Sequence, residues 1–331
     1  MASIKEVAKH AGVAISTVSK VLNNYPNVSE ETKIKVNAAI EELGYVPNAV
    51  AAALSSKKAG RIAIVLRLSK STQAIDEVNM QYLHGAIDCA RRLNMDVVTV
   101  FYSMLEDKSV EEMVNYFRSQ AVNGIIICGI GKVEKPFLKL LESQIFKVVS
   151  IDALLVNPST SCVWINQFQA QYDVAQKTLE MDPTPYKKLL YIAGTKHSFV
   201  TEERLRGIKQ FAADYKLKLT IKEGEFSEKK AREITLKFGE KTDMIACASD
   251  LMAIGAMRAL VDMDIFRPVC GFDGITLMGY VGKQMNTVKQ DFFHIAEVAV
   301  EELRRLLDGG EGQEVILEHS LVRMEYMDII R

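Results

Sequence analysis

From Arg61 onward, short apolar runs alternate with amphipathic stretches, and the whole series occurs twice. Short apolar runs bounded by turns are typical of buried parallel strands, and the stretches between them repeat apolar residues at helical spacing. The first series predicts strands at 61–66, 96–101, 124–128 and 147–151, and helices at 76–92, 110–121 and 135–144. The second predicts strands at 188–192, 217–221, 244–248 and 269–272, and helices at 202–215, 228–238 and 250–261. Two such series indicate two doubly wound α/β subdomains.

The C-terminal segment is too short for another domain, so we expect it to complete the two sheets. It adds a predicted helix at 296–307 and strands near 314–318 and 321–324. The predicted N-terminal subdomain therefore comprises residues 61–163 with about 291–318. The C-terminal subdomain comprises 164–290 with about 319–331.

Residues 1–46 have a purely helical pattern. Gly12 separates two short amphipathic helices, Ser29 is placed to cap a third helix, and Gly44 to end it. The predicted inward faces are Ile4, Val7, Ala8 and Ala11; then Val18, Val21 and Leu22; then Val36, Ala39, Ile40 and Leu43. Two short helices joined by a glycine-containing turn form a helix-turn-helix, whose second helix lies in the major groove of DNA. We therefore expect an all-α DNA-binding headpiece.

Residues 47–60 are predicted to form a hinge helix and linker. Pro47 stops the preceding helix, and Asn48 can cap a short alanine-rich segment whose only large apolar residue is Leu54. Such a short segment does not hold a helix in isolation. We expect it to order only in context.

Composition restricts the remaining classes of function. The chain has 331 residues, 48% of them hydrophobic, and a net charge of −1, so its charge alone does not indicate a nucleic-acid partner. The N-terminus lacks an apolar signal core, and no run approaches membrane-spanning length, so we expect a cytoplasmic protein without a membrane partner. Five cysteines without metal-ligand spacing fit reduced thiols.

No catalytic residue, metal site or cofactor is predicted. The sequence lacks the HExxH and GxSxG patterns. Residues 129–132 (GIGK) match a fragment of a phosphate loop, but a strand-to-helix turn is the favoured interpretation. A hydrolase or kinase stays an alternative, because fold does not fix function.

Five blocks within residues 4–54 carry a more specific signal. They are Ile4-x-x-Val7-Ala8, Ala11-Gly12-Val13, Ser16 to Asn23 (STVSKVLN), Leu43-Gly44-Tyr45-x-Pro47-Asn48 and Ala51-x-x-Leu54. In this register the segment resembles the LacI/GalR family of bacterial transcription repressors. Residues 248–256 and 271–273 resemble the sensor domain of that family. The resemblance implies a core similar to periplasmic sugar-binding proteins and a protein that dimerises.

The same resemblance implies roles in DNA binding. Ile15, Ser16 and Lys20 fall at base-reading positions, where lysine can donate to guanine and isoleucine can touch a thymine methyl. Leu54 matches a wedge inserted into the minor groove. The positions that resemble phosphate contacts are Thr17, Ser19, Asn23, Asn27, Ser29 and Thr32. Alternatively, the serines and threonines only cap and solvate helices, and Leu54 packs in a core.

The effector site is expected beyond the carboxyl ends of the strands. Ser69, Asp152, Ser249 and Asp273 follow predicted strands, and Asp152, Arg204 and Asp273 fall where family members contact sugars or purines. Carboxylates with one arginine suit vicinal hydroxyl groups, and Trp164 could stack on a sugar ring. The alternatives are that Arg204 pairs with Glu202 or Glu203 on a helix surface and that Trp164 belongs to the core.

The sequence thus predicts a LacI-type transcriptional regulator, in the first place a repressor. We expect it to bind a palindromic double-stranded DNA operator as a homodimer, under control of a sugar-like effector. The chain has Ala14 where relatives have a serine or threonine cap, and its headpiece has no arginine. These departures support one alternative, a cytosolic ligand-binding protein with a degenerate DNA module.

Overall fold

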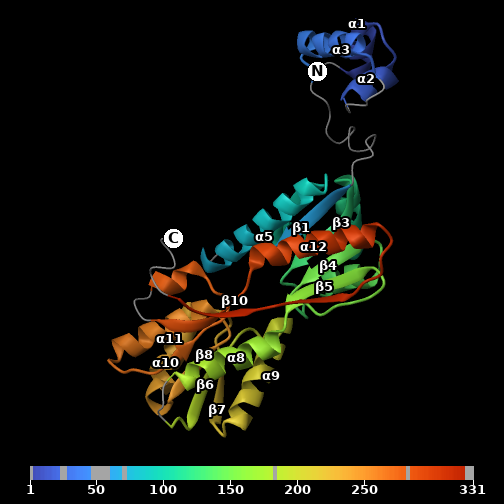
Figure 1. Cartoon of the computed structure of the whole chain (residues 1–331). Helices are drawn as coiled ribbons and strands as arrows, with labels where there is room; N and C mark the ends of the chain where they lie inside the picture. The colour runs from blue at the N-terminus through green and yellow to red at the C-terminus, as the bar shows by residue number, and fades with distance from the viewer. Residues whose placement is uncertain are drawn as a thin grey trace. The chain divides into compact units, whose positions relative to one another are not determined.

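The computed structural model describes residues 3–22, 28–45, 60–68, 73–181, 185–280 and 284–324. The chain divides into two compact units, one reaching to Gly60 and one that contains nearly all of the remainder (Figure 1). We call them the headpiece and the core. Among the described residues, every helix is too short or too polar to cross a lipid bilayer.

The headpiece is a bundle of three helices: α1 (Ile4–Ala11), α2 (Ile15–Leu22) and α3 (Glu30–Leu43). Val7, Val18 and Val36, one from each helix, are fully buried in its centre. Gly12 and Gly44 end α1 and α3 with left-handed backbone, at φ values of 67° and 55°. The Ser29 hydroxyl accepts the N–H of Thr32 at the start of α3. The predicted helices, inward faces, cap and stops are confirmed.

The first sheet of the core is parallel throughout and has the strand order β11-β5-β4-β3-β1-β2. Its strands are β1 (Arg61–Leu66), β2 (Asp96–Phe101), β3 (Val122–Cys128), β4 (Lys147–Ile151), β5 (Thr160–Ile165) and β11 (Glu314–Leu317). On one face α5 (Gln73–Arg92) packs beside α12 (Phe292–Leu307). On the other face α6 (Val110–Ser119) and α7 (Lys135–Glu142) cover the apolar residues of β1 and β3.

The second sheet has the order β12-β10-β9-β8-β6-β7, in which only β12 runs antiparallel to its neighbour. Its strands are β6 (Lys188–Ala193), β7 (Lys218–Glu223), β8 (Met244–Cys247), β9 (Val269–Cys270), β10 (Met285–Lys289) and β12 (Ser320–Met324). The flanking helices form two pairs, α8 (Gln167–Glu180) with α9 (Phe199–Asp214) and α10 (Glu228–Phe238) with α11 (Asp250–Asp262). Short 3-10 turns lie at Tyr102–Met104 (η1), Gly239–Lys241 (η2) and Thr276–Tyr280 (η3).

The chain passes between the two sheets three times: after β5, between β10 and α12, and between β11 and β12 (Figure 1). The last two crossings fall at the predicted positions. The first comes after Ile165 rather than after residue 163, because β5 continues to that residue. Neither β5 nor α8 nor β10 was predicted from the sequence.

Candidate ligand site and nucleic-acid-binding surface

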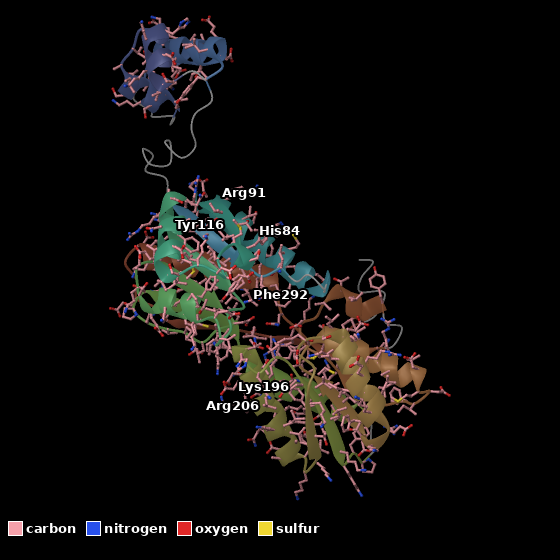
Figure 2. The ribbon with its side chains drawn as sticks, turned by 180° about the vertical axis from the view of Figure 1, so that it is seen from behind. His84, Arg91, Tyr116, Lys196, Arg206 and Phe292 are labelled. Carbon is pink, nitrogen blue, oxygen red and sulfur yellow. The ribbon has the colours of Figure 1, made fainter. Side chains whose placement is uncertain are left out.

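A cavity of about 970 Å³ lies between the two subdomains of the core. It is lined by residues that follow β3 and β4 in the first sheet and β6 and β8 in the second, so it lies beyond the carboxyl ends of both sheets, as predicted. Four of the predicted ligand residues line it: Asp152, Arg204, Ser249 and Asp273. Phe292, at the start of α12, adds an apolar side chain to the lining. Figure 2 shows it where the two subdomains of the core face each other.

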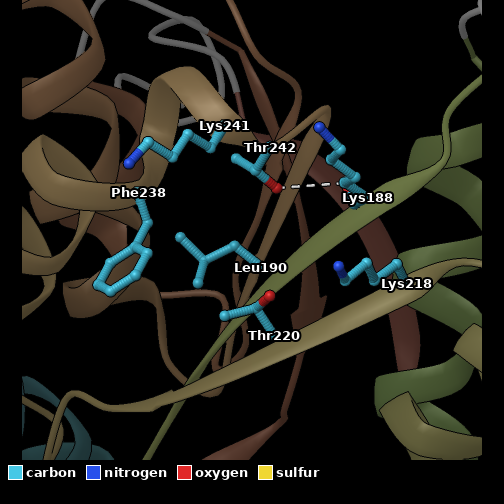
Figure 3. A pocket seen from close by; sticks show the side chains of 7 residues that line it. All are labelled: Lys188, Leu190, Lys218, Thr220, Phe238, Lys241 and Thr242. Atoms are coloured by element: carbon cyan, nitrogen blue, oxygen red, sulfur yellow. Dashed lines mark hydrogen bonds between the residues drawn. The ribbon is translucent and has the colours of Figure 1, made fainter.

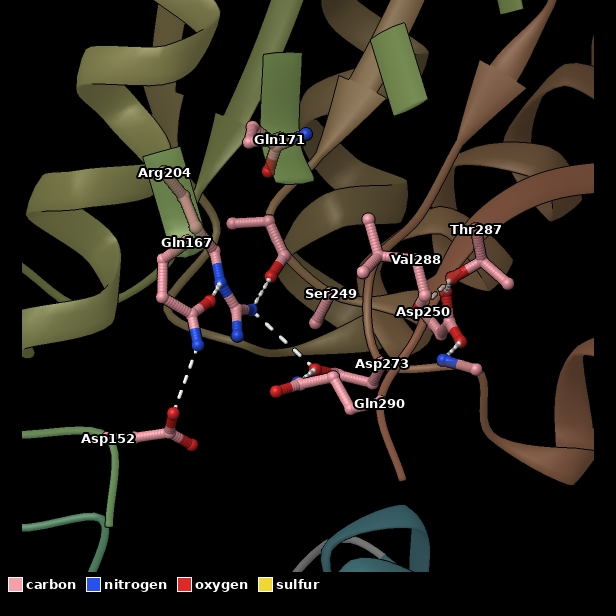
Figure 4. A network of polar contacts seen from close by, with 12 residues as sticks. Asp152, Gln167, Gln171, Arg204, Ser249, Asp250, Asp273, Thr287, Val288 and Gln290 are labelled. Atoms are coloured by element: carbon pink, nitrogen blue, oxygen red, sulfur yellow. Dashed lines mark hydrogen bonds and ion pairs between the residues drawn. The ribbon is translucent and has the colours of Figure 1, made fainter. Parts of the chain in front are cut away.

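A chain of polar contacts connects the two subdomains at this cavity (Figure 4). Gln167 donates from Nε2 to Asp152 Oδ1 at 3.0 Å and accepts from Arg204 Nε at 2.8 Å. Arg204 Nη1 donates to the carbonyl oxygen of Ala248 at 2.5 Å and lies 3.6 Å from Asp273 Oδ1. One arginine therefore links a carboxylate of the first subdomain, through Gln167, to a carboxylate of the second.

Arg204 is a buried member of the site and not a surface residue. It is 3% exposed, and its guanidinium carbon lies 3.6 Å from the centroid of the Phe272 ring. The neighbouring acids have other partners, because Glu202 pairs with Lys132 and Glu203 pairs with Arg206. The alternative of a surface ion pair with these glutamates is therefore wrong.

Both site carboxylates are held in an environment that disfavours their charge. Burial raises the pKa of Asp152, against the opposing effect of Arg204. Burial also raises the pKa of Asp273 to about 7, and the nearby carboxylates add to the effect while Arg204 opposes it. Both residues have left-handed backbone, with φ of 62° for Asp152 and 122° for Asp273. Strained backbone and raised carboxylate pKa values are typical of functional positions.

Asp250 supports the loop that carries Asp273, and its neighbour Ser249 faces the cavity. The fully buried Asp250 carboxylate accepts the N–H groups of Gly274 and Ile275 at 2.7 and 2.9 Å, and the Thr287 hydroxyl at 2.5 Å. Burial raises the pKa of Asp250 to about 6. Ser249 lines the cavity and caps α11, accepting the N–H of Met252. Asp250 therefore fixes the loop rather than facing a ligand.

Trp164 was predicted to stack on a ligand, and this prediction is wrong. Its side chain is 8% exposed in β5, and its indole Nε1 donates to Glu314 Oε1 on the edge strand β11 at 2.8 Å. It does not line the cavity. Its bond to Glu314 and its packing explain why it is buried, so the alternative that Trp164 belongs to the core is the correct one. Ser69 lies outside the described residues.

Several residues that line the cavity or bond to its carboxylates were not predicted from the sequence. Tyr82 donates to Asp152 Oδ2 at 3.4 Å, and Gln290 donates to Asp273 Oδ1 at 3.0 Å. Asn79, on the same face of α5 as Tyr82, donates to the carbonyl oxygen of Arg67 at 2.7 Å. Gln167 could have been found, since it directly follows Asn166, which caps α8 after a strand. Tyr82 and Asn79 carry no comparable signal, because they lie within a long helix.

Two clasps join the subdomains at the cavity mouth. On one side Gly131 forms a β-bridge with Ser198, and the N–H of Lys132 donates to the carbonyl oxygen of His197 at 2.7 Å. On the other side Glu77 Oε1 accepts the N–H of Thr276 at 2.9 Å and its hydroxyl at 2.6 Å. The motif at 129–132 is therefore a strand-to-helix turn, as favoured, and it belongs to the first clasp.

The headpiece presents its predicted base-reading residues on one face of α2. Ser16 and Lys20 are exposed, and Ile15 is 43% exposed although it is a large apolar residue. Thr17, Ser19 and Thr32 are half-buried, and Ser29 is exposed. The N–H groups of Thr17 and Val18 donate to the carbonyl oxygen of Ala14, whose methyl side chain offers no cap. Asn23, Asn27, Leu54 and the predicted hinge at 47–59 lie outside the described residues.

Within the described ranges, no group of histidine, cysteine and acidic side chains has the arrangement of a metal site. The five cysteines are buried, and all five are free thiols.

Two family models match the chain. Residues 3–48 match the family described as bacterial regulatory proteins, lacI family, and residues 68–311 match a periplasmic binding protein domain. The catabolite control protein A of Priestia megaterium is 28% identical over 338 residues, which cover 98% of this chain and 96% of that protein. The HTH-type transcriptional regulator RegA of Clostridium saccharobutylicum is 28% identical and covers 98% of both chains.

Solved structures show the same fold over the full length. A lac repressor dimer bound to operator and the anti-inducer ONPF superposes with a TM-score of 0.81 at 24% identity, covering 97% of this chain and 98% of that one. A complex of the transcriptional regulator CelR with cellobiose gives a TM-score of 0.70 at 23% identity, covering 98% of this chain and 100% of that one.

Proposed function

Because the chain belongs to the lacI family of bacterial regulatory proteins, we propose that it is a repressor-type regulator that binds a palindromic operator as a homodimer. A small effector bound in the cavity of the core would control its affinity for DNA. Ile15, Ser16 and Lys20 would read bases. Thr17, Ser19, Asn23, Asn27, Ser29 and Thr32 would contact phosphates, and Leu54 would enter the minor groove.

The observation that carries the proposal is the polar chain from Asp152 through Gln167 and Arg204 to Asp273. A ligand that bonds to both ends of this chain favours one spacing of the two subdomains over another. Such a difference in affinity between two states is what couples an effector site to a distant site. A protein that only binds a ligand needs no DNA-binding headpiece, whereas a ligand-controlled regulator needs both the headpiece and the ligand site.

We expect the effector to be an uncharged polyhydroxylated molecule. Asp152 and Asp273 supply acceptors for vicinal hydroxyl groups, and Arg204 is the only buried cation among the residues that the structure describes. Cellobiose in the related CelR structure is a ligand of this class. Two carboxylates against one arginine would repel an anionic ligand.

The DNA-binding part is tested by selecting duplexes from a random pool with the full-length protein and measuring the affinity for the selected sequence. We expect a palindromic sequence. Lys20→Gln should weaken specific binding by at least about fivefold, since a good base contact is worth about 1–3 kcal/mol. Lys35→Gln on α3 removes the same charge and should change binding much less. A random pool that yields no enriched sequence would favour the alternative of a ligand-binding protein with a degenerate DNA module.

The effector part is tested by a thermal-shift screen of sugars, polyols and nucleobases on the full-length protein. The operator affinity is then measured with each compound that binds. We expect an uncharged polyhydroxylated compound to bind and to change the operator affinity. A compound that binds without changing it would contradict the proposed coupling and leave DNA binding itself unaffected.

A further inference from the structure

A second hollow of the core lies at the amino-terminal edge of the second sheet and has a volume of about 250 Å³ (Figure 3). Lys188 and Lys218 begin β6 and β7, and Lys241 with Thr242 comes directly before β8. The cavity described above lies beyond the opposite ends of these strands and shares no lining residue with this hollow. The hollow is therefore a separate candidate site.

Its rim is positively charged, and the protein itself does not compensate that charge. In the part of the chain that the structure describes, other lysines such as Lys196 and Lys230 form ion pairs, but Lys188, Lys218 and Lys241 form none. Asp243, which directly follows Thr242, is engaged elsewhere, because its Oδ2 accepts the backbone N–H groups of Lys187 and Lys188 at 2.8 Å each. Glu240 is exposed on η2 and does not line the hollow.

The floor of the hollow is apolar, with one unused hydroxyl group. Leu190 is 1% exposed, and the Phe238 ring lies beside it, with Lys222 Nζ 4.5 Å from the ring centroid. The Thr242 hydroxyl is held by the carbonyl oxygens of Lys188 and Met244 at 3.1 Å each. The Thr220 hydroxyl lines the hollow and has no bond to any other residue that the structure describes.

We propose that this hollow binds a small phosphate ester, with the phosphate among Lys188, Lys218 and Lys241 and the carbon part against Leu190 and Phe238. Ammonium groups of one sign gathered around a hollow create a positive potential that attracts a dianion. Lysine binds phosphate as a point charge, and the Thr220 hydroxyl offers it a further donor. Ligand pockets are commonly about 300–1,000 Å³, so this volume favours a short ester over a nucleotide.

The apolar floor decides between a small ligand and a phosphorylated protein. A phosphorylated segment on a protein surface needs the charged rim only, whereas Leu190 and Phe238 lie inside the hollow, where a short carbon chain would reach them. The proposal does not depend on the effector or the operator. It gives the protein a second small-molecule site, whose ligand is an anion, whereas the ligand expected in the cavity is uncharged.

The test is calorimetric titration of the full-length protein with glycerol 3-phosphate, glycerol and inorganic phosphate. We expect the ester to bind more tightly than inorganic phosphate, and glycerol not to bind. Lys188→Gln and Lys218→Gln should each weaken ester binding by up to about fivefold, the range for an exposed charge pair. Lys209→Gln, which removes an exposed lysine of α9 in the same subdomain, should not. Phe238→Leu should weaken binding of the ester but not of inorganic phosphate.

Four results would overturn the proposal. The first is that glycerol 3-phosphate does not bind. The second is that Lys209→Gln weakens binding of the ester as much as Lys188→Gln does, which would mean diffuse attraction by the whole surface. Inorganic phosphate bound as tightly as the ester, with no effect of Phe238→Leu, would indicate an adventitious anion only. A phosphoserine peptide that binds where the ester does not would identify a docking surface for a phosphorylated protein.

Discussion

Replacing Asp273 by asparagine should make the protein more stable at alkaline pH. In the folded protein, burial raises the pKa of Asp273 to about 7, so the ionised carboxylate costs free energy whenever the pH is higher. Asparagine has nearly the same shape as aspartate and carries no charge, and both residue types are enriched at positive φ. The Asp273→Asn variant therefore isolates the cost of the charge.

The magnitude follows from the two pKa values. The difference between an ordinary 3.8 and about 7 corresponds to about 4 kcal/mol, at about 1.4 kcal/mol for each tenfold change in the proton equilibrium. Two effects reduce this figure. The Asp273 side chain keeps 21% exposure, so water screens its charge, and the variant loses the ion pair with Arg204 at 3.6 Å. We therefore expect the unfolding free energy of the variant to be about 2 kcal/mol higher at pH 8.

The gain should shrink on acidification. Between about pH 4 and pH 7 the folded state holds a proton on Asp273 that the unfolded state has lost. The unfolding free energy of the unchanged protein therefore falls as the pH rises through this window. Asp273→Asn loses this slope, so its advantage should drop below about 1 kcal/mol at pH 5.

Urea unfolding at several pH values measures the unfolding free energies of the variant and of the unchanged protein. The fluorescence of Trp164, the single tryptophan, reports the unfolding, because this side chain is buried in the core. Asp264→Asn is the matched control, because Asp264 also has left-handed backbone, at φ 54°, but is exposed. The reasoning is refuted if Asp273→Asn is less stable than the unchanged protein at pH 8, or if both have the same dependence on pH.

Three further substitutions test the packing, the cap and a clasp. Gly255→Ala should lower the unfolding free energy by about 1–3 kcal/mol, because an added Cβ would lie 2.2 Å from the carbonyl oxygen of Glu228. Urea unfolding measures it, and an unchanged value would contradict the close packing of α10 and α11. Ser29→Ala should destabilise the headpiece by about 1 kcal/mol in a thermal melt followed by circular dichroism, and Ser29→Asn, which keeps a cap, should recover most of it. Glu202→Gln removes the exposed ion pair with Lys132, whose backbone N–H belongs to the first clasp, so the effector Kd should change less than about fivefold. A larger change would mean that this ion pair, and not the backbone contacts alone, holds the first clasp together.

The sequence was sufficient to predict the elements whose residues behave typically. The apolar strands and the helices capped by serine or ended by glycine are where they were expected. The strands that were missed are buried but polar. β5 includes Ser161, whose hydroxyl donates to Glu302 at 2.5 Å, and β10 includes Thr287, which donates to Asp250. Their hydroxyl groups are satisfied by distant partners, and hydropathy cannot reveal such partners.

The residues of the site could be predicted from the sequence to about the same extent as the strands and helices. Asp152, Ser249 and Asp273 follow strands, so topology places them at one edge. Gln167 is different, because glutamine is seldom fully buried, and here it is buried only through its bonds to Asp152 and Arg204. Trp164 was wrongly predicted to stack on a ligand, because an aromatic side chain packs equally well in a core and on a sugar ring. The sequence alone does not give its hydrogen-bond partner, Glu314.

The three crossings between the sheets have a consequence for how the protein emerges from the ribosome. The first sheet receives its edge strand, β11, and its covering helix, α12, only after almost the whole second subdomain has been synthesised. Until then β5 has an unpaired edge and one face of the sheet lacks half of its cover, a state prone to aggregation. The N-terminal subdomain therefore cannot complete its fold first, despite being translated first. A released chain that ends before residue 292 should be protease-sensitive in both subdomains, and one that includes β12 in neither.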